Sequence, residues 1–245
     1  MYKAMSLKAI LIRVGIDQTF GNWNAPCNPE TREFVYIPIP QDKPNIQGLE
    51  KFYADHSISA LYYFSTRNKI YISLPDHLAK KRMHLDPDFN HLSYGDTANR
   101  GGRLLNFKEN DIVVFYSGLR SIHGEPKLIY AIIGLFVVQS IEQVKNVQPK
   151  NFNKNAHTRN IQNTDSDIIV RGKLGISGRL EKYIPIGEFR NKSYRVNRDL
   201  LKEWGGLNVK DGWIQRSANP PLFLKPEKFV KWFKNQSPTL IASNN

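Results

Sequence analysis

The sequence lacks the features that mark several common protein classes. It contains a single cysteine, Cys27, which excludes an intramolecular disulfide and fits a reducing compartment. No stretch of about 18 consecutive apolar residues is present, so no transmembrane helix is expected. The apolar run at 9–12 is too short for a secretory signal. We therefore expect a cytoplasmic protein with no membrane partner.

Sequence motifs for common cofactors are also missing. The chain has no P-loop, no GxGxxG fingerprint and no GxSxG nucleophile elbow. Residues 172–178, GKLGISG, carry too few glycines in the required places, and no Cys/His zinc pattern exists. The cofactor is therefore left unknown, and no metal site is assigned.

Acidic residues are scarce relative to basic ones. The 35 Lys and Arg residues outnumber the 22 Asp and Glu residues, which gives a formal net charge of +13. Such an excess weakens the compact state through self-repulsion, and a phosphate backbone is the commonest partner that compensates it. We expect nucleic acid as the partner. The alternatives are an ordinary basic protein from an AT-rich genome and a protein that binds an anionic membrane surface.

The hydrophobic pattern predicts an α+β fold. Hydrophobic residues make up 40% of the chain, which is enough for a core. Two long antiparallel strands are expected at 111–119 and 127–141, where Val, Ile, Phe and Tyr are dense. Other predicted strands lie at 7–14, 60–74 (a strand pair), 167–173 and 177–187, and predicted helices at 49–54, 197–204 and 226–235. Residues 75–103 are expected to form a long loop, and the tail 237–245 to fray.

Several segments resemble one known family. RVGIDQTFG (13–21), YIPIPQ (36–41), HLDPDFNHLSYGD (84–96) and NDIVVFYSGL (110–119) are similar to the family called nucleotide modification associated domain 3, as are RLEKYIPIG (179–187) and GWIQRSANP (212–220). The resemblance implies a role in DNA base modification, in the setting of phages or mobile elements, with DNA favoured over RNA and other modification enzymes as possible partners. It implies no established reaction. At Gln41 the family pattern would have Glu.

A second resemblance concerns residues 110–144, which have the shape of a PUA/EVE-type module that cradles RNA or flipped modified bases. Asn110 stands where that pattern has glycine. The fold implied is a mainly antiparallel β-barrel with a few short helices. We expect a single domain over 1–245, with a candidate sub-boundary in the Asn-rich segment 146–163.

One candidate site is the polar segment around HLDPDF. His84, Asp86 and Asp88 alternate, so they would share one side of an extended chain and serve as catalytic groups. Tyr94 and Asp96 follow closely as substrate-binding candidates. With the distant His157, the pair His84 and Asp86 has the residue types of a two-His-one-carboxylate iron site, but the regular strands of an oxygenase barrel are missing. The alternative is that these residues cap turns.

Other candidates lie at predicted strand ends and in a C-terminal loop. Asp17 is a further catalytic candidate, because the loop after a strand is free to shape a pocket. Tyr116 is expected to be exposed and to stack on a base. The remaining substrate-binding candidates are Arg13, Ser117, Trp213, Gln215, Arg216 and Ser217, chosen because Arg and Gln read base edges and Trp stacks on them. Turn formation and surface solvation are the alternatives.

Three functions are compatible with these observations. The first is a module that recognises a base within a DNA-modification system. The second is an enzyme that acts on a nucleotide or base through the His84, Asp86 and Asp88 cluster. The third is an accessory subunit without catalytic activity. The sequence leaves open whether the protein is an enzyme.

Overall fold

The centre of the protein is one eight-stranded sheet, seen in a computed structural model that describes residues 6–124, 128–215 and 219–245. The main strand order is β1-β6-β7-β8-β5, and β2, β9 and β12 pair at its sides. The bounds are β1 Ala9–Arg13, β2 Pro26–Cys27, β5 Ser93–Asp96, β6 Ile112–Ser121, β7 Leu128–Gln143, β8 Ile168–Gly172, β9 Gly178–Pro185 and β12 Leu240–Ile241. β1 and β2 run parallel to β6, and the other pairs are antiparallel.

The predicted α+β class and the long antiparallel strand pair are confirmed. Val113 pairs with Phe136 and Ser117 with Ala131 along β6 and β7. β7 then pairs with β8 on the far side of 146–163, so the sheet continues across that segment. Among the described residues β1 and β5 stay at opposite ends of the strand order. A closed barrel is therefore not found.

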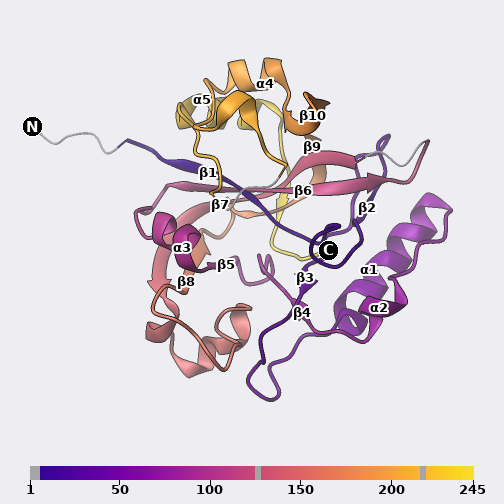
Figure 1. Cartoon of the computed structure of the whole chain (residues 1–245), viewed down its shortest axis with the longest axis vertical. Coiled ribbons are helices and arrows are strands. Elements are labelled where there is room, and N and C mark those ends of the chain that lie inside the picture. The colour runs from indigo at the N-terminus through magenta and orange to yellow at the C-terminus, as the bar shows by residue number, and fades with distance from the viewer. Residues whose placement is uncertain (1–5, 125–127, 216–218) are drawn as a thin grey trace, which may run out of the picture.

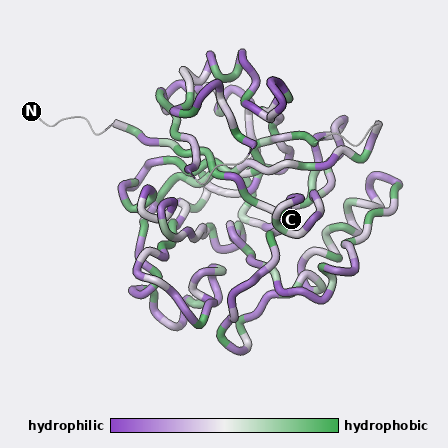
Figure 2. Tube along the Cα trace, in the orientation of Figure 1, coloured by the Kyte–Doolittle hydropathy of each residue, from purple (hydrophilic) through white to green (hydrophobic). Residues whose placement is uncertain are grey.

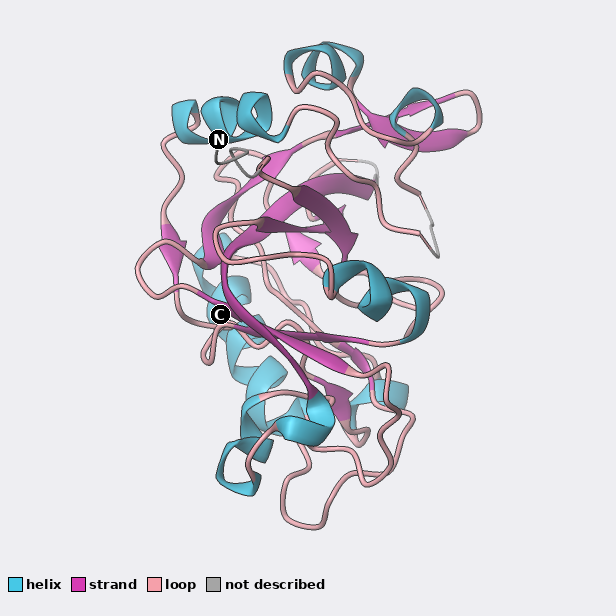
Figure 3. Ribbon diagram, turned by 90° about the vertical axis from the view of Figure 1, so that its left-hand side faces the viewer, coloured by secondary structure: helices cyan, strands magenta, loops and turns pink. Residues whose placement is uncertain are grey.

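Both faces of this sheet are buried. Alternate residues of β1 enter two separate hydrophobic clusters, with Ile10 and Ile12 on one face and Ala9 and Leu11 on the other. Helices α4 (Arg198–Glu203) and α5 (Pro226–Asn235) cover one face, and α1 (Tyr53–Asn68) and α2 (Asp76–Ala79) belong to the layer on the other (Figures 1 and 3). Figure 2 shows hydrophobic residues concentrated along the central strands and hydrophilic ones in the outer loops.

Helix α1 corrects two sequence predictions. The helix at 49–54 and the strand pair at 60–74 are both wrong, because one helix runs through Tyr53–Asn68. Its buried residues include Tyr53, Leu61 and Phe64, whose spacing suits one helical face. The Tyr and Phe residues of this segment favour strands, so the helical spacing of its apolar residues was not recognised in the sequence. Packing against the sheet decided the structure.

The segment 75–103 is also more ordered than predicted. It contains α2, β4 (Met83–His84), β5 and α3 (Ala98–Leu104), and β4 pairs with β3 (Ile39–Pro40). The C-terminal tail is not frayed, because β12 pairs with β9. A hairpin of β10 (Gly187–Arg190) and β11 (Ser193–Val196) was not predicted, and short 3-10 turns cover Val144–Asn146, Pro149–Lys154 and Lys210–Gly212.

The helices predicted near the C-terminus are confirmed. Asn197 caps α4 by accepting hydrogen bonds from the backbone N–H groups of Asp199 and Leu200. Helix α5 begins at Pro226, as its sequence indicates, and buries Phe229, Trp232 and Phe233. None of the helices in the described residues is long and apolar enough to cross a membrane.

Candidate functional site

The strand at Met83–His84 separates apolar from polar side chains. Met83 and Leu85 are almost completely buried in the hydrophobic cluster under the sheet. Because successive side chains of an extended chain point to opposite sides, His84 and Asp86 face the other way. The predicted shared orientation of these two residues is therefore explained by the packing of their apolar neighbours.

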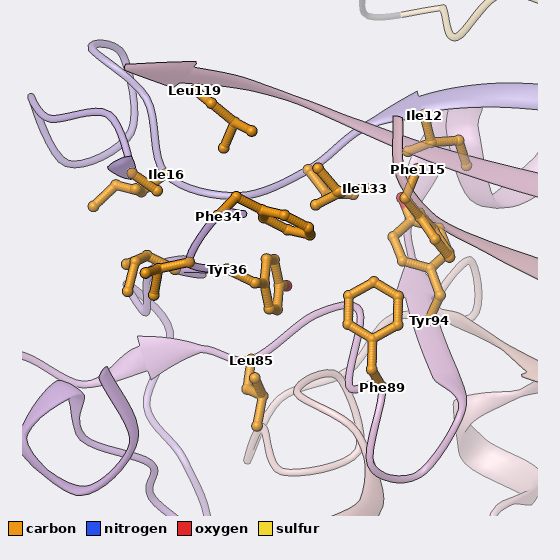
Figure 4. Packing of buried hydrophobic residues seen from close by; sticks show 14 of the residues in the cluster. Ile12, Ile16, Phe34, Tyr36, Leu85, Phe89, Tyr94, Phe115, Leu119 and Ile133 are labelled. Carbon is orange, nitrogen blue, oxygen red and sulfur yellow. The ribbon is translucent and has the colours of Figure 1, made fainter. Parts of the chain in front are cut away.

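Phe89 anchors the loop that follows. Its ring packs edge-on against Tyr36, Phe115 and Phe136 at centroid distances of 5.3, 5.8 and 5.7 Å. Figure 4 shows Phe89 beside Tyr94 and Phe115 in this core. Asp88 and Ser93 exchange two backbone hydrogen bonds, which closes the loop and starts β5. The chain thus returns beside Asp86 within a few residues.

Strand β5 holds the carboxylate of Asp86. The backbone N–H of Gly95 donates to both of its oxygens, at 2.9 and 3.1 Å, and Asn155 Nδ2 donates to Oδ1 at 3.0 Å. Asp86 is 8% exposed. Charge-assisted hydrogen bonds of this kind fix the orientation of a buried carboxylate.

His157 reaches the same place from the Asn-rich segment. Asn155 Oδ1 accepts a hydrogen bond from the backbone N–H of His157, and the ring Nδ1 lies 3.1 Å from Asp167 Oδ1. Asp167 is fully buried and also accepts hydrogen bonds from Thr164. The Asn-rich segment therefore supplies a buried imidazole next to the sheet.

His84, Asp86 and His157 converge on one point. Asp86 Oδ2 lies 3.8 Å from His84 Nε2 and 3.6 Å from His157 Nε2, and the two imidazole centroids are 5.0 Å apart. Among the described residues, these three form the one group of His, Cys, Asp or Glu whose atoms have the spacing of metal ligands, all within 4.8 Å. The same atoms are suited to proton transfer.

Burial shifts the pKa values of Asp86 and His84, which lie on the same side of the extended chain. It raises the pKa of Asp86 to about 7, against the opposing effect of His157. Burial also lowers the pKa of His84 well below its usual value, and electrostatic effects of His157, Arg159, Lys43 and Arg100 act in the same direction. Perturbed pairs of this kind are typical of functional sites.

Tyr94 and Asp96 lie next to this group. The Tyr94 hydroxyl donates to Asp96 Oδ2 at 2.5 Å, and Arg100 Nε lies 3.1 Å from Asp96 Oδ1. The Arg100 side chain is 43% exposed, whereas Asp96 is buried. The cluster therefore has a positively charged group at the surface close to its buried centre.

Asp88 has different partners from Asp86. Its Oδ2 is 3.0 Å from Arg159 Nη2 and 2.9 Å from His91 Nδ1, and its Oδ1 accepts a hydrogen bond from Asn244. The chain turns at Asp88, which ends the alternation that would place it beside His84. These contacts give Asp88 the character of a buried ion-pair residue.

Arg13, Asp17, Tyr116 and Gln215 form a second group. Arg13 Nη2 lies 2.9 Å from Asp17 Oδ2, and Arg13 Nη1 donates to the backbone carbonyl of Gln215. Asp17 also accepts from the backbone N–H groups two and three residues later, as a turn-capping residue does. No hydrogen bond or ion pair within the described ranges joins this group to His84 or Asp86.

Tyr116 is not exposed, contrary to the sequence prediction. It is 1% exposed and donates to the backbone carbonyl of Ile214 at 2.6 Å, because the sheet is covered on both faces. Ser117 is also buried, and Trp213 is half-buried. Arg216 and Ser217 lie outside the described residues.

Three polar residues of the site were not predicted. Gln41 Oε1 lies 2.6 Å from His84 Nδ1, Asn155 binds Asp86, and Asp167 binds His157. Each acts through a contact with a residue far away in the sequence. The local sequence offers one signal for such site residues, namely a polar residue next to a buried strand, such as Asp167 before β8.

A groove beside α1 does not open on this centre. It has a volume of about 1030 Å³ and lies between α1 and the C-terminal segment. Met83 and Leu85 line it, so it adjoins the side of the strand opposite to His84 and Asp86.

Comparison with known proteins identifies the family. No curated protein and no solved structure matches the chain. Residues 8–220 match the family described as Nucleotide modification associated domain 3. The matched stretch runs from β1 past β11 and includes His84, Asp86 and His157. The chain belongs to the nucleotide modification associated domain 3 family.

Proposed function

We propose that this protein is an enzyme of a DNA base-modification system and acts on a nucleotide or base at His84, Asp86 and His157. The observation that carries the proposal is their convergence in a largely buried cluster of polar groups, each held by a further polar side chain. Such pre-positioning favours a reactive role, because burial of three titratable groups is otherwise costly. Membership of a family associated with nucleotide modification supports a nucleotide or base as the substrate.

The surroundings favour an anionic substrate. Arg100 is partly exposed beside Asp96, and Lys43 is exposed close enough to act on the pKa of His84. Positive groups at the rim of a reactive centre suit the phosphates of a nucleotide. Tyr94 is buried and donates its hydroxyl to Asp96, so it would contribute to the site by orienting that carboxylate.

Nucleoside mass spectrometry tests the proposal. DNA from cells that express the wild-type protein together with its neighbouring modification genes should contain a base that is absent with Asp86→Asn or His157→Ala. His123→Ala is the matched control, because His123 is exposed and its side chain makes no hydrogen bond to any residue that the structure describes. Unchanged nucleosides with folded Asp86→Asn protein would remove the enzymatic role.

Base recognition without chemistry is the second candidate. Tyr62 and Tyr63 on α1 are each 67% exposed and Tyr71 is 89% exposed, and Arg67 and Lys69 lie between them in the sequence. Exposed aromatic rings beside cations are typical of surfaces that bind single strands. Tyr63→Ala would weaken nucleic-acid binding in this case, whereas Asp86→Asn would leave binding unchanged.

A further inference from the structure

The three central atoms all carry lone pairs directed at the same point. His84 Nδ1 contacts Gln41 Oε1 at 2.6 Å, and His157 Nδ1 contacts Asp167 Oδ1 at 3.1 Å. Both partners are acceptors, so each Nδ1 carries a hydrogen, and in the neutral ring each Nε2 then has a free lone pair. The Nε2 atoms face Asp86 Oδ2, which is an acceptor as well when the carboxyl group is ionised.

The orientation of the Gln41 amide supports this assignment. Its Nε2 donates to the Lys43 carbonyl and to Asn160 Oδ1, both at 2.8 Å. The two acceptors require the amide nitrogen on that side, which leaves the oxygen facing His84. The tautomer of His84 therefore follows from a chain of hydrogen bonds, as is usual for imidazoles that bind metals.

A shared proton does not fit the distances. The gaps of 3.6 and 3.8 Å between Asp86 Oδ2 and the two Nε2 atoms exceed those of hydrogen bonds. A metal with ligand bonds of about 2.0–2.2 Å holds neighbouring ligands at roughly 3–3.5 Å. The two distances are slightly longer than that, and the three ligand atoms lie within 4.8 Å of one another, so metal binding would draw the two imidazoles toward the carboxylate.

We propose that His84 Nε2, His157 Nε2 and Asp86 Oδ2 bind one divalent transition-metal ion. The chemistry of the ligands favours Fe(II) or Zn(II), whereas Mg²⁺ and Ca²⁺ prefer sites made of oxygen. Three protein ligands leave positions for water or substrate, as in catalytic sites. Gln41 and Asp167 would orient the rings, and Gly95 and Asn155 would orient the carboxylate. The inference deepens the proposed function, since it concerns the same three residues.

Titration of the metal-free full chain with Co²⁺ tests this directly, without any substrate. We expect one equivalent to bind with visible d–d absorption, and zinc to displace it. His157→Ala and Asp86→Ala should weaken binding at least 100-fold. Gln41→Ala keeps all three ligands and should weaken binding roughly 10–100-fold. His123→Ala, with its exposed ring, should bind like the wild type.

Two outcomes would overturn the metal site. The first is wild-type protein that takes up no cobalt at 100-fold excess over micromolar protein, or that binds Mg²⁺ in competition with cobalt. The second is unchanged binding by folded Gln41→Ala and His157→Ala, with folding checked by circular dichroism. Metal binding without any change in nucleosides would instead reject the proposed function and leave the metal site in place.

Discussion

Gly95 shows how one missing side chain positions an imidazole. A Cβ atom built on Gly95 would lie 2.3 Å from His157 Cδ2 and 2.7 Å from Asn155 Oδ1. Real contacts are never so short, so the imidazole of His157 can lie against β5 only because position 95 is glycine. The same residue donates its N–H to Asp86. Gly95 thus helps to position two of the three central residues, His157 and Asp86.

Gly95→Ala should therefore displace His157. We expect at least tenfold weaker cobalt binding and a loss of about 1–3 kcal/mol in the free energy of unfolding, as overpacking usually causes. Gly102→Ala is the control, because a Cβ atom there meets nothing within 4 Å and the residue lies in α3. It should be neutral or stabilising by about 0.5–1 kcal/mol. Wild-type metal affinity in Gly95→Ala would contradict this account.

Substitution of Asp88 should lower stability, whereas substitution of Asp86 should lower metal affinity. Asp88→Ala leaves Arg159 buried without its carboxylate, which typically costs about 3–5 kcal/mol. Arg159 is 2% exposed, so solvent cannot replace that partner. Urea unfolding measures the loss, and metal binding by the folded fraction should persist. Stability equal to the wild type would show that Asp88 is not the structural residue its contacts indicate.

At the scale of elements, the C-terminal segment joins parts of the chain that are distant in sequence. β12 pairs with β9, and Asn244 receives a hydrogen bond from the backbone N–H of Phe89 at 2.7 Å while its amide donates to Asp88. Asn245 exchanges two hydrogen bonds with the backbone of Tyr36. The segment therefore holds the loop that carries Asp88 against the core.

Asn244→Ala should destabilise the protein by about 1–3 kcal/mol, because the backbone N–H of Phe89 loses its acceptor. Asn235→Ala at the end of α5 is the matched control, since Asn235 is exposed, and it should stay within about 0.5 kcal/mol. Thermal unfolding measures both variants. If Asn244→Ala melts at the same temperature as the wild type, the segment lies on the surface without stabilising the loop.

At the scale of the whole molecule, net charge determines how partners are attracted. The formal charge of +13 predicts binding to nucleic acid with a steep dependence on salt. We expect affinity for a DNA oligonucleotide to fall on the order of tenfold or more between 50 and 200 mM salt. Fluorescence anisotropy measures this. Unfolding measured over the same salt range controls for changes in the fold, and binding that ignores salt would exclude a phosphate-based interaction.

The sequence by itself determined the elements whose signals are local. β6, β7, α4 and α5 follow from dense β-branched runs, from the Asn197 cap and from the proline at the start of α5. The sequence also carried the family resemblance, and its alternation placed His84 and Asp86 on one side of an extended chain. These features depend on neighbours within a few residues, where periodicity and capping act.

Tertiary structure alone decided the remaining features. α1 became a helix because its buried face packs on the sheet, and Tyr116 became buried because both sheet faces are covered. The sequence suggested His157 only as a residue type, whereas pairing of β5 with β8 and the bonds to Asn155 and Asp167 placed it beside Asp86. Contacts between residues far apart in the chain leave no local pattern, because they depend on how the whole chain packs.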